Sequence, residues 1–193
     1  VVLTGDYRER TRGGFHQILP ALERIVQTVA AKDGIIAVLG NHDTCKMVPG
    51  MENMGITVLA NETITLHRQG DILTVTGIDD PHYYYTDHAI QALDEPHANF
   101  KIALVHSPEL ADVAADRGYH LYLCGHTHAG QICLPGGFPI ITHLHTGGKY
   151  ARGLWRHSEM IGYTSSGCGT VGIPIRFNCK SEIALIRLER RPG

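Results

Sequence analysis

The chain has 193 residues, which is the length of one domain and enough to enclose a sizeable core. Its apolar fraction of 43% is ordinary for a globular protein, and its net charge is −2. This near-neutral balance, without a long run of Lys or Arg, argues against a broad nucleic-acid-binding face. The five cysteines are an odd number without C-x-x-C spacing, so we expect buried free thiols and no disulfide framework.

The first forty residues are typical of a β-α-β unit. Val1–Thr4 is a short apolar strand that leads into Gly5-Asp6. Apolar residues at helical spacing predict a helix between Phe15 and Ala31, and Ile35–Leu39 is a second strand. We therefore expect these two strands to pair in parallel.

The middle of the chain adds a hairpin and another strand that ends in a histidine. Strand-like runs over 63–67 and 72–78 are separated by a turn signal at Gly70-Asp71. Residues 100–106 form the next strand and end at His106. Ser107-Pro108-Glu109 then has the N-cap, first-turn proline and first-turn acid that open a helix.

A strand over 120–124 leads into Gly125-His126-Thr127-His128. Alternate residues of extended backbone point the same way, so both imidazoles can face one side. Imidazole is a common ligand of first-row metals. From Gln131 onward the runs are short and strand-like, among them 140–143, 160–165, 173–177 and 182–188, and they predict a second, largely antiparallel sheet.

Four apolar strands thus end in Asp, Asn-His-Asp, His and His-x-His, a pattern typical of an α/β sheet with its site at the carboxyl ends of its strands. The motifs GD (5–6), GNHD (40–43), VH (105–106) and GHTH (125–128), in this order, resemble the calcineurin-like metallophosphoesterases. The runs 125–135 and 165–177 are most similar to the YaeI-like phosphodiesterase branch. The resemblance covers essentially the whole chain. It implies an α/β fold, a four-layer α/β/β/α sandwich of two mixed sheets, in a single domain over 1–193.

The resemblance also implies a dinuclear centre of divalent metal ions, for which Mn, Fe and Zn are the candidates. It gives Asp6 the role of a bridging carboxylate. Asn41, His106 and His126 would complete one metal site, and His128 would belong to the other.

The general acid implied by the resemblance is His42, which would protonate the leaving oxygen after in-line attack on phosphorus by a metal-bound hydroxide. The sequence leaves open whether Asp43 or Glu9 orients this imidazole. Arg8 and Arg10 follow the first motif, and they fit a phosphate-binding role and a solvated loop equally well.

The family's first strand carries a D-x-H motif that supplies the remaining ligands of the first metal, and no such motif precedes Val1. We therefore expect that an N-terminal strand is missing from this chain. A degenerate one-metal or inactive protein is the alternative.

The implied function is a metal-dependent phosphodiesterase acting on a small phosphodiester or a lipid-linked phosphate, and no nucleic-acid partner is expected. The alternatives are a pyrophosphatase acting on a lipid-linked nucleotide sugar and a non-catalytic, metal-binding pseudoenzyme. Membrane association would come through a segment outside this chain, and a cytoplasmic or membrane-associated location is favoured over secretion.

Some remaining polar residues near these motifs have two open interpretations. His143 and His145 form another H-x-H and are interpreted as packing residues, with a place in the pocket as the alternative. Tyr83, Tyr84 and Tyr85 either line the substrate pocket or pack in the core.

Overall fold

A computed structural model of the chain describes residues 1–68, 70–94 and 98–189. The described α-helices are α1 (Ile18–Val26), α2 (Val48–Asn53), α3 (Asp87–Gln91) and α4 (Ala111–Asp116). Single 3-10 turns lie at Cys45–Met47, Ala92–Asp94, Pro108–Leu110, His128–Gly130 and Gly148–Tyr150. The strands are β1 (Val2–Leu3), β2 (Ile35–Ala37), β3 (Ile56–Val58), β4 (Glu62–Arg68), β5 (Asp71–Gly77), β6 (Phe100–Leu104), β7 (Leu121–Cys124), β8 (Cys133–Leu134), β9 (Phe138–Pro139), β10 (Gly153–His157) and β11 (Met160–Thr164).

The N-terminal half forms a three-stranded sheet in the order β1-β2-β3. Its strands are parallel, with Val2 opposite Ile36 and Ile36 opposite Thr57, so the expected β-α-β pairing is confirmed. Helix α1 is shorter than the periodicity predicts. The Thr28 hydroxyl donates to the Ile25 carbonyl oxygen at 2.7 Å, a local side-chain bond of the kind that competes with continued helix.

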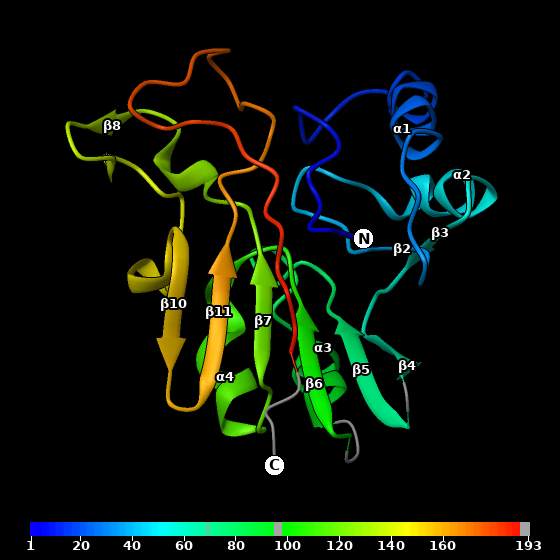
Figure 1. Cartoon of the computed structure of the whole chain (residues 1–193). Coiled ribbons are helices and arrows are strands. Elements are labelled where there is room, and N and C mark those ends of the chain that lie inside the picture. The colour runs from blue at the N-terminus through cyan, green and yellow to red at the C-terminus, as the bar shows by residue number, and fades with distance from the viewer. Residues whose placement is uncertain (69, 95–97, 190–193) are drawn as a thin grey trace.

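The second sheet has six strands in the order β10-β11-β7-β6-β5-β4. Its four central strands are parallel, and antiparallel strands β10 and β4 form the two edges. Figure 1 shows the arrows of β11, β7, β6 and β5 pointing the same way. Their carboxyl ends therefore lie on one side of the molecule, where loops from both sheets gather.

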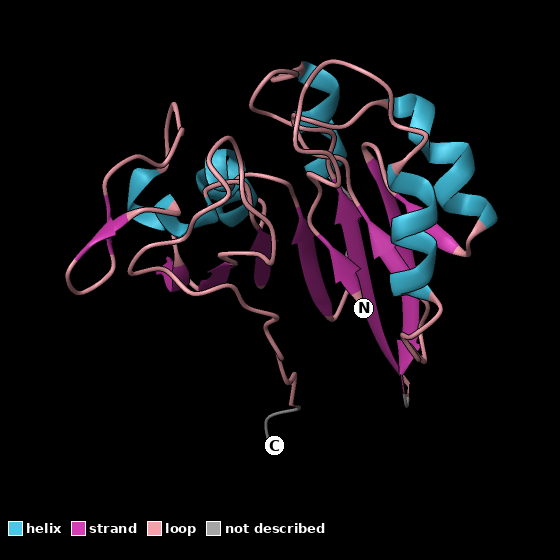
Figure 2. Ribbon diagram, turned by 90° about the horizontal axis from the view of Figure 1, so that it is seen from above, coloured by secondary structure: helices cyan, strands magenta, loops and turns pink. Residues whose placement is uncertain are grey.

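Three clusters of apolar side chains pack between the layers of helices and sheets. In the run 35–39, Ile35 and Ala37 pack with residues of α1 and α2, while Ile36 and Val38 pack against the six-stranded sheet. A third cluster joins the other face of that sheet to α3 and α4. Figure 2 shows α1 and α2 outside the strands at one edge of the molecule. The expected four-layer α/β/β/α fold is confirmed, with the six-stranded sheet mixed and the described strands of the smaller sheet all parallel.

The C-terminal third differs from the sequence prediction. The segment 160–165 does form a strand, but β10 and β11 join the main sheet, because β11 pairs in parallel with β7. The predicted strands at 140–143, 173–177 and 182–188 are not strands, so the expected second antiparallel sheet is wrong. In the last of these segments Ile183 and Leu185 are over 90% exposed, and within the described residues no neighbouring strand pairs with them.

The expectation of free cysteines can be compared with the structure. All five cysteines are free, and Cys124 and Cys133 are the buried ones. Burial raises the pKa of the Cys124 thiol to about 12, so it remains a neutral packing residue. Across 1–68, 70–94 and 98–189, none of the helices has the length and apolar character needed to cross a bilayer.

Candidate metal centre

The four strand-end motifs meet between the two sheets. Asp6 follows β1, and Asn41 follows β2 after a short connection. His106 and His126 follow β6 and β7 of the larger sheet. A cavity of about 150 Å³ opens at this point; it is lined by Asp6, Asn41, His42, His82, Tyr83, His126, His128, His143 and Val171.

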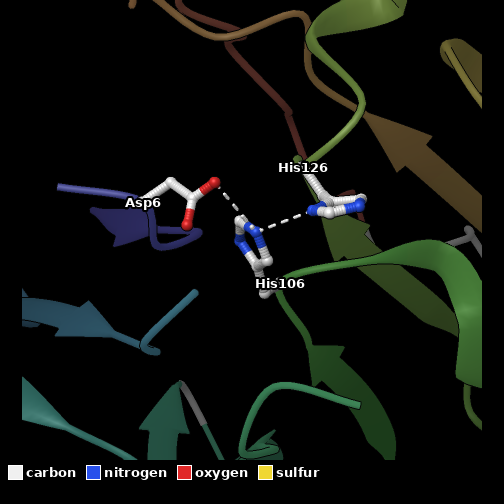
Figure 3. Close-up of side chains that lie close together, drawn as sticks. All are labelled: Asp6, His106 and His126. Carbon is white, nitrogen blue, oxygen red and sulfur yellow. Dashed lines mark hydrogen bonds and ion pairs between the residues drawn. The ribbon is translucent and has the colours of Figure 1, made fainter. Parts of the chain in front are cut away.

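Ligand atoms of Asp6, His106 and His126 all lie within 4.8 Å of one another. Figure 3 shows the three side chains pointing toward one another from three different strand ends. His106 Nε2 lies 3.3 Å from Asp6 Oδ2 and 3.1 Å from His126 Nδ1. Asn41 Oδ1 completes the group, at 3.1 Å from His106 Nε2 and 3.0 Å from His126 Nδ1.

The backbone fixes which ring nitrogens face this centre. His106 Nδ1 lies 2.6 Å from the Thr4 carbonyl oxygen, which can only accept, so Nδ1 carries the proton and neutral Nε2 presents a lone pair. His126 Nε2 is directed toward the His143 carbonyl oxygen at 3.5 Å, which leaves His126 Nδ1 facing inward. Four acceptor atoms therefore converge on one point. A divalent cation satisfies all four, so this donor set fits a metal ion.

The close packing of these side chains shifts the pKa values of the metal-free centre. Burial raises the pKa of Asp6, but the hydrogen bond and charge of His106 outweigh burial and bring it to about 2. Burial lowers the pKa of His106, yet its contacts with Asp6 raise it above the ordinary value. The pKa of His126 falls to about 3, because burial and then the neighbouring His106 and His82 oppose a second positive charge.

His128 lines the same cavity but does not belong to the three-residue group. Its Nδ1 atom is buried, and in the described structure it has no hydrogen-bond partner. Burial also lowers the pKa of this imidazole, so the ring stays neutral. A buried, neutral nitrogen without a partner is suited to a metal ion, and the assignment of His128 to a second metal stays a prediction.

The backbone around the centre is strained. Asp6, His126 and His128 have φ values of 58°, 66° and 50°, a left-handed region that costs roughly 1 kcal/mol or more for a residue with a side chain. Two glycines allow the close approach of the loops. A Cβ atom on Gly40 would lie 2.3 Å from Asp6 Oδ1, and one on Gly5 would lie 2.8 Å from His106 Nδ1.

The orienting partner of His42, which the sequence left open, is a main-chain atom. His42 Nδ1 lies 2.6 Å from the Glu9 carbonyl oxygen, so this nitrogen donates and Nε2 is the atom that exchanges a proton. Asp43 has another task, because its carboxylate accepts the amides of Asp6 and Gly40 at 2.7 and 2.9 Å. Burial raises the pKa of Asp43 to about 6, against the effect of the Gly40 amide. Asp43 therefore fixes the loop that carries Asp6.

The structure adds His82, which the sequence analysis did not single out. His82 lines the cavity, and its ring packs 4.6 Å from that of His126 and stacks 4.4 Å from that of His145. Its Nδ1 donates to buried Glu109 at 3.2 Å. Glu109 also accepts the Ser107 hydroxyl at 3.0 Å and the His145 amide at 2.9 Å. Ser107 is the N-cap residue that the sequence predicts, but its hydroxyl binds Glu109 instead of a main-chain amide.

The structure also places the histidines, tyrosines and arginines whose roles the sequence left open. His143 lines the cavity, while His145 supports His82 by stacking. Tyr83 also lines the cavity, and the tyrosines at 83–85 are all more than half exposed, so packing in the core is wrong for them. Arg8 is buried and donates to the Gly13 carbonyl oxygen at 3.3 Å, which makes it a loop-bracing residue. Arg10 is exposed and does not line the cavity.

Carboxylate and amide oxygens with imidazole nitrogens, at the edge of a solvent-accessible cavity, are a donor set typical of metal-dependent enzymes. Comparison with protein families agrees. The family model of the calcineurin-like phosphoesterases (Metallophos) matches residues 1–130. The chain therefore belongs to this family, and it is a metal-dependent hydrolase of phosphoric esters.

Proteins similar to this chain include two from bacteria. The chain is 31% identical to the uncharacterised metallophosphoesterase YkuE of Bacillus subtilis over 198 residues, covering 98% of this chain and 67% of YkuE. It is 27% identical to the phosphodiesterase YaeI of Escherichia coli over 196 residues, covering 97% of this chain and 69% of YaeI. Among solved structures, the sulfate thiohydrolase SoxB of Thermus thermophilus aligns with a TM-score of 0.48 and 16% identity, over 75% of this chain and 29% of SoxB.

Proposed function

We propose that the protein is a phosphodiesterase with two divalent metal ions, which hydrolyses a small phosphodiester by in-line attack of water. The observation that carries the proposal is the convergence of Asp6, Asn41 and His126 on Nε2 of His106. The similarity to YaeI, a protein named as a phosphodiesterase, supports the choice of a diester.

The residues of the centre have distinct roles in this proposal. Asp6, Asn41, His106 and His126 would hold one ion, and Asp6 and His128 would help to hold the other, together with ligands that are still to be identified. Bound ions supply charge neutralisation and an activated water nucleophile. Because Asn41 is a neutral ligand, the centre keeps a positive charge that attracts an anionic phosphodiester.

His42 is proposed as the general acid. The Glu9 carbonyl oxygen holds its Nδ1, and the ring lines the cavity, so Nε2 can donate a proton to the departing oxygen. The His42 ring is not part of the group of ligand atoms from Asp6, His106 and His126. Its loss should therefore affect the chemical step and leave metal binding intact.

Replacement of His42 by Ala should lower turnover according to the leaving group. For an alkyl leaving group, which needs a proton, we expect a loss of about a hundredfold or more. For p-nitrophenolate, a good leaving group, the loss should be much smaller. Steady-state kinetics over a series of aryl and alkyl diesters measures the loss of turnover for each leaving group. Metal analysis of each protein shows whether the variant still binds metal. Loss of metal from this variant, or an equal loss of turnover across the series, would contradict the assignment.

His82 is proposed as a residue that positions substrate, because Glu109 fixes its ring at the cavity wall. Glu109→Gln keeps the size of the side chain but removes the charge that His82 donates to. We expect KM to rise by about tenfold with a smaller change in kcat. His82→Ala should show the same split, and the exposed Glu52→Gln is a matched control. A fall of about tenfold in kcat with an unchanged KM would contradict a role in substrate binding.

A substrate panel tests the reaction class. Chelator-treated protein is reconstituted with Mn²⁺, Fe²⁺ or Zn²⁺ and given bis-p-nitrophenyl phosphate, p-nitrophenyl phosphate and a nucleotide sugar. The proposal predicts metal-dependent turnover with a preference for the diester. A preference for the pyrophosphate bond of the nucleotide sugar would favour a pyrophosphatase. Turnover without added metal after chelation would contradict the proposal.

A further inference from the structure

A small lobe beyond the carboxyl ends of the strands displays its apolar residues to solvent. We define the apolar lobe as residues 131–141 and 171–178. Figure 1 shows both segments, the β8 hairpin and the orange loop after β11, extending away from the main sheet on the same side. Seven large apolar side chains of the lobe are 55% to 67% exposed; they are Leu134, Phe138, Ile140, Ile141, Ile173, Ile175 and Phe177.

The two segments of the lobe are held together by polar groups on the inside. Backbone bonds join Cys133 N to the Phe177 carbonyl oxygen at 2.9 Å and Phe177 N to the Gln131 carbonyl oxygen at 3.0 Å. The buried Gln131 amide group binds the main chain of Val171 and Ile173 at 2.8 to 3.1 Å. The lobe is therefore ordered with polar groups inside and apolar groups outside. This arrangement is the reverse of a water-facing surface, and exposed apolar groups gathered on one part of a protein indicate an interaction site.

The charge around the lobe indicates the kind of partner. Residues 118–181 contain five Lys or Arg and one acidic residue, a net +4, whereas the rest of the chain contains 12 basic and 18 acidic residues, a net −6. Glu159, the single acid, and Arg156 both lie at the end of the β10–β11 pair away from the lobe, and Lys149 contacts Asp112. The basic residues in or next to the lobe are therefore Arg152, Arg176 and Lys180. Arg152 lies against the β8–β9 turn, because a Cβ atom on Gly137 would be 2.5 Å from its Nη1. Glu182, just beyond the range, binds the Tyr163 hydroxyl and the Ser166 amide.

We propose that the apolar lobe binds the surface of an anionic lipid bilayer, with its apolar side chains in the boundary between headgroups and acyl chains. Apolar side chains on protruding loops, with a basic surrounding and few acids, complement that surface in both hydrophobicity and charge. Binding of the lobe does not depend on the proposed reaction. Because Val171 of the lobe also lines the metal cavity, binding brings the cavity to lipid headgroups; this last consequence rests on the proposed function.

The test is co-sedimentation of the metal-loaded protein with vesicles of phosphatidylcholine, alone or mixed equally with phosphatidylglycerol. We expect binding to the mixed vesicles, weakened by added salt, and little binding to phosphatidylcholine alone. The double variant Phe138→Ser with Ile175→Ser should bind on the order of tenfold or more weakly. Ile25→Ser, which changes an equally exposed apolar residue of α1, is the matched control. Turnover of soluble bis-p-nitrophenyl phosphate should be the same in all four proteins, namely the wild type, the double variant, the control and Phe138→Trp.

A second readout follows insertion itself. The chain has one tryptophan, Trp155, which is buried, so a Phe138→Trp variant reports on the lobe. Its emission should shift to shorter wavelength when mixed vesicles are added. The inference is overturned if binding is absent, if the double variant binds as well as the wild type, or if the wild type self-associates without lipid and the double variant does not. Lipid binding without turnover in any of the proteins would contradict the proposed function and leave the lobe as a membrane-binding surface.

Discussion

Asp6→Asn is expected to reduce turnover by about a thousandfold or more and to release at least one metal ion per chain. The substitution keeps the shape of the side chain, so Oδ1 can still accept the His42 amide that it binds at 3.0 Å. It removes the negative charge that faces His106 and that would bridge the two ions. The fold should therefore survive while the centre loses its central ligand.

Metal analysis by mass spectrometry and turnover of bis-p-nitrophenyl phosphate measure the two effects on the same sample. Asp33→Asn, a change at an exposed acidic residue far from the cavity, should leave both unchanged. If Asp6→Asn retained its full metal content and turnover, Asp6 could not be the bridging ligand.

Gly40→Ala is expected to have the second largest effect, because it inserts an atom between two ligands. The new Cβ would lie 2.3 Å from Asp6 Oδ1 and 2.6 Å from His106 Cε1. We expect stability to fall by about 1–3 kcal/mol, as in other overpacked sites. Turnover should fall by about a hundredfold or more, because displacement of a ligand by about 1 Å misplaces the reacting groups.

Gly148→Ala is the matched control, since a Cβ atom there meets no atom within 4 Å and the residue does not have positive φ. Denaturant unfolding of both variants separates stability from turnover. A Gly40→Ala protein that unfolds earlier but turns over normally would show that the loop relaxes without moving the ligands, which would contradict the account of a tightly packed centre.

The site motifs could be predicted because strand ends are local signals. Asp6, Asn41, His106 and His126 each follow a short apolar run, and parallel strands bring their carboxyl ends to one side. The same signal was available for His82, since Asp79-Asp80-Pro81-His82 follows β5, which is parallel to β6.

The C-terminal third was harder to predict because its structure depends on distant partners. The runs 173–177 and 182–188 have the composition of strands. Within the described residues, however, neither run pairs with a neighbouring strand beyond the single bridge between Phe177 and Ile132. The orientation of His42 also could not be read from its neighbours, because the partner is the main chain of Glu9 rather than a side chain. Propensity describes a segment's local preference, whereas pairing is decided by the rest of the fold.

The most direct test of the central claim is a crystal structure of the protein grown with Mn²⁺, with anomalous diffraction to locate the ion. The account predicts an anomalous peak bounded by Asp6 Oδ2, Asn41 Oδ1, His106 Nε2 and His126 Nδ1, and a second peak on the side of His128. A structure in which manganese binds elsewhere, while these four atoms keep their mutual contacts without an ion, would contradict it.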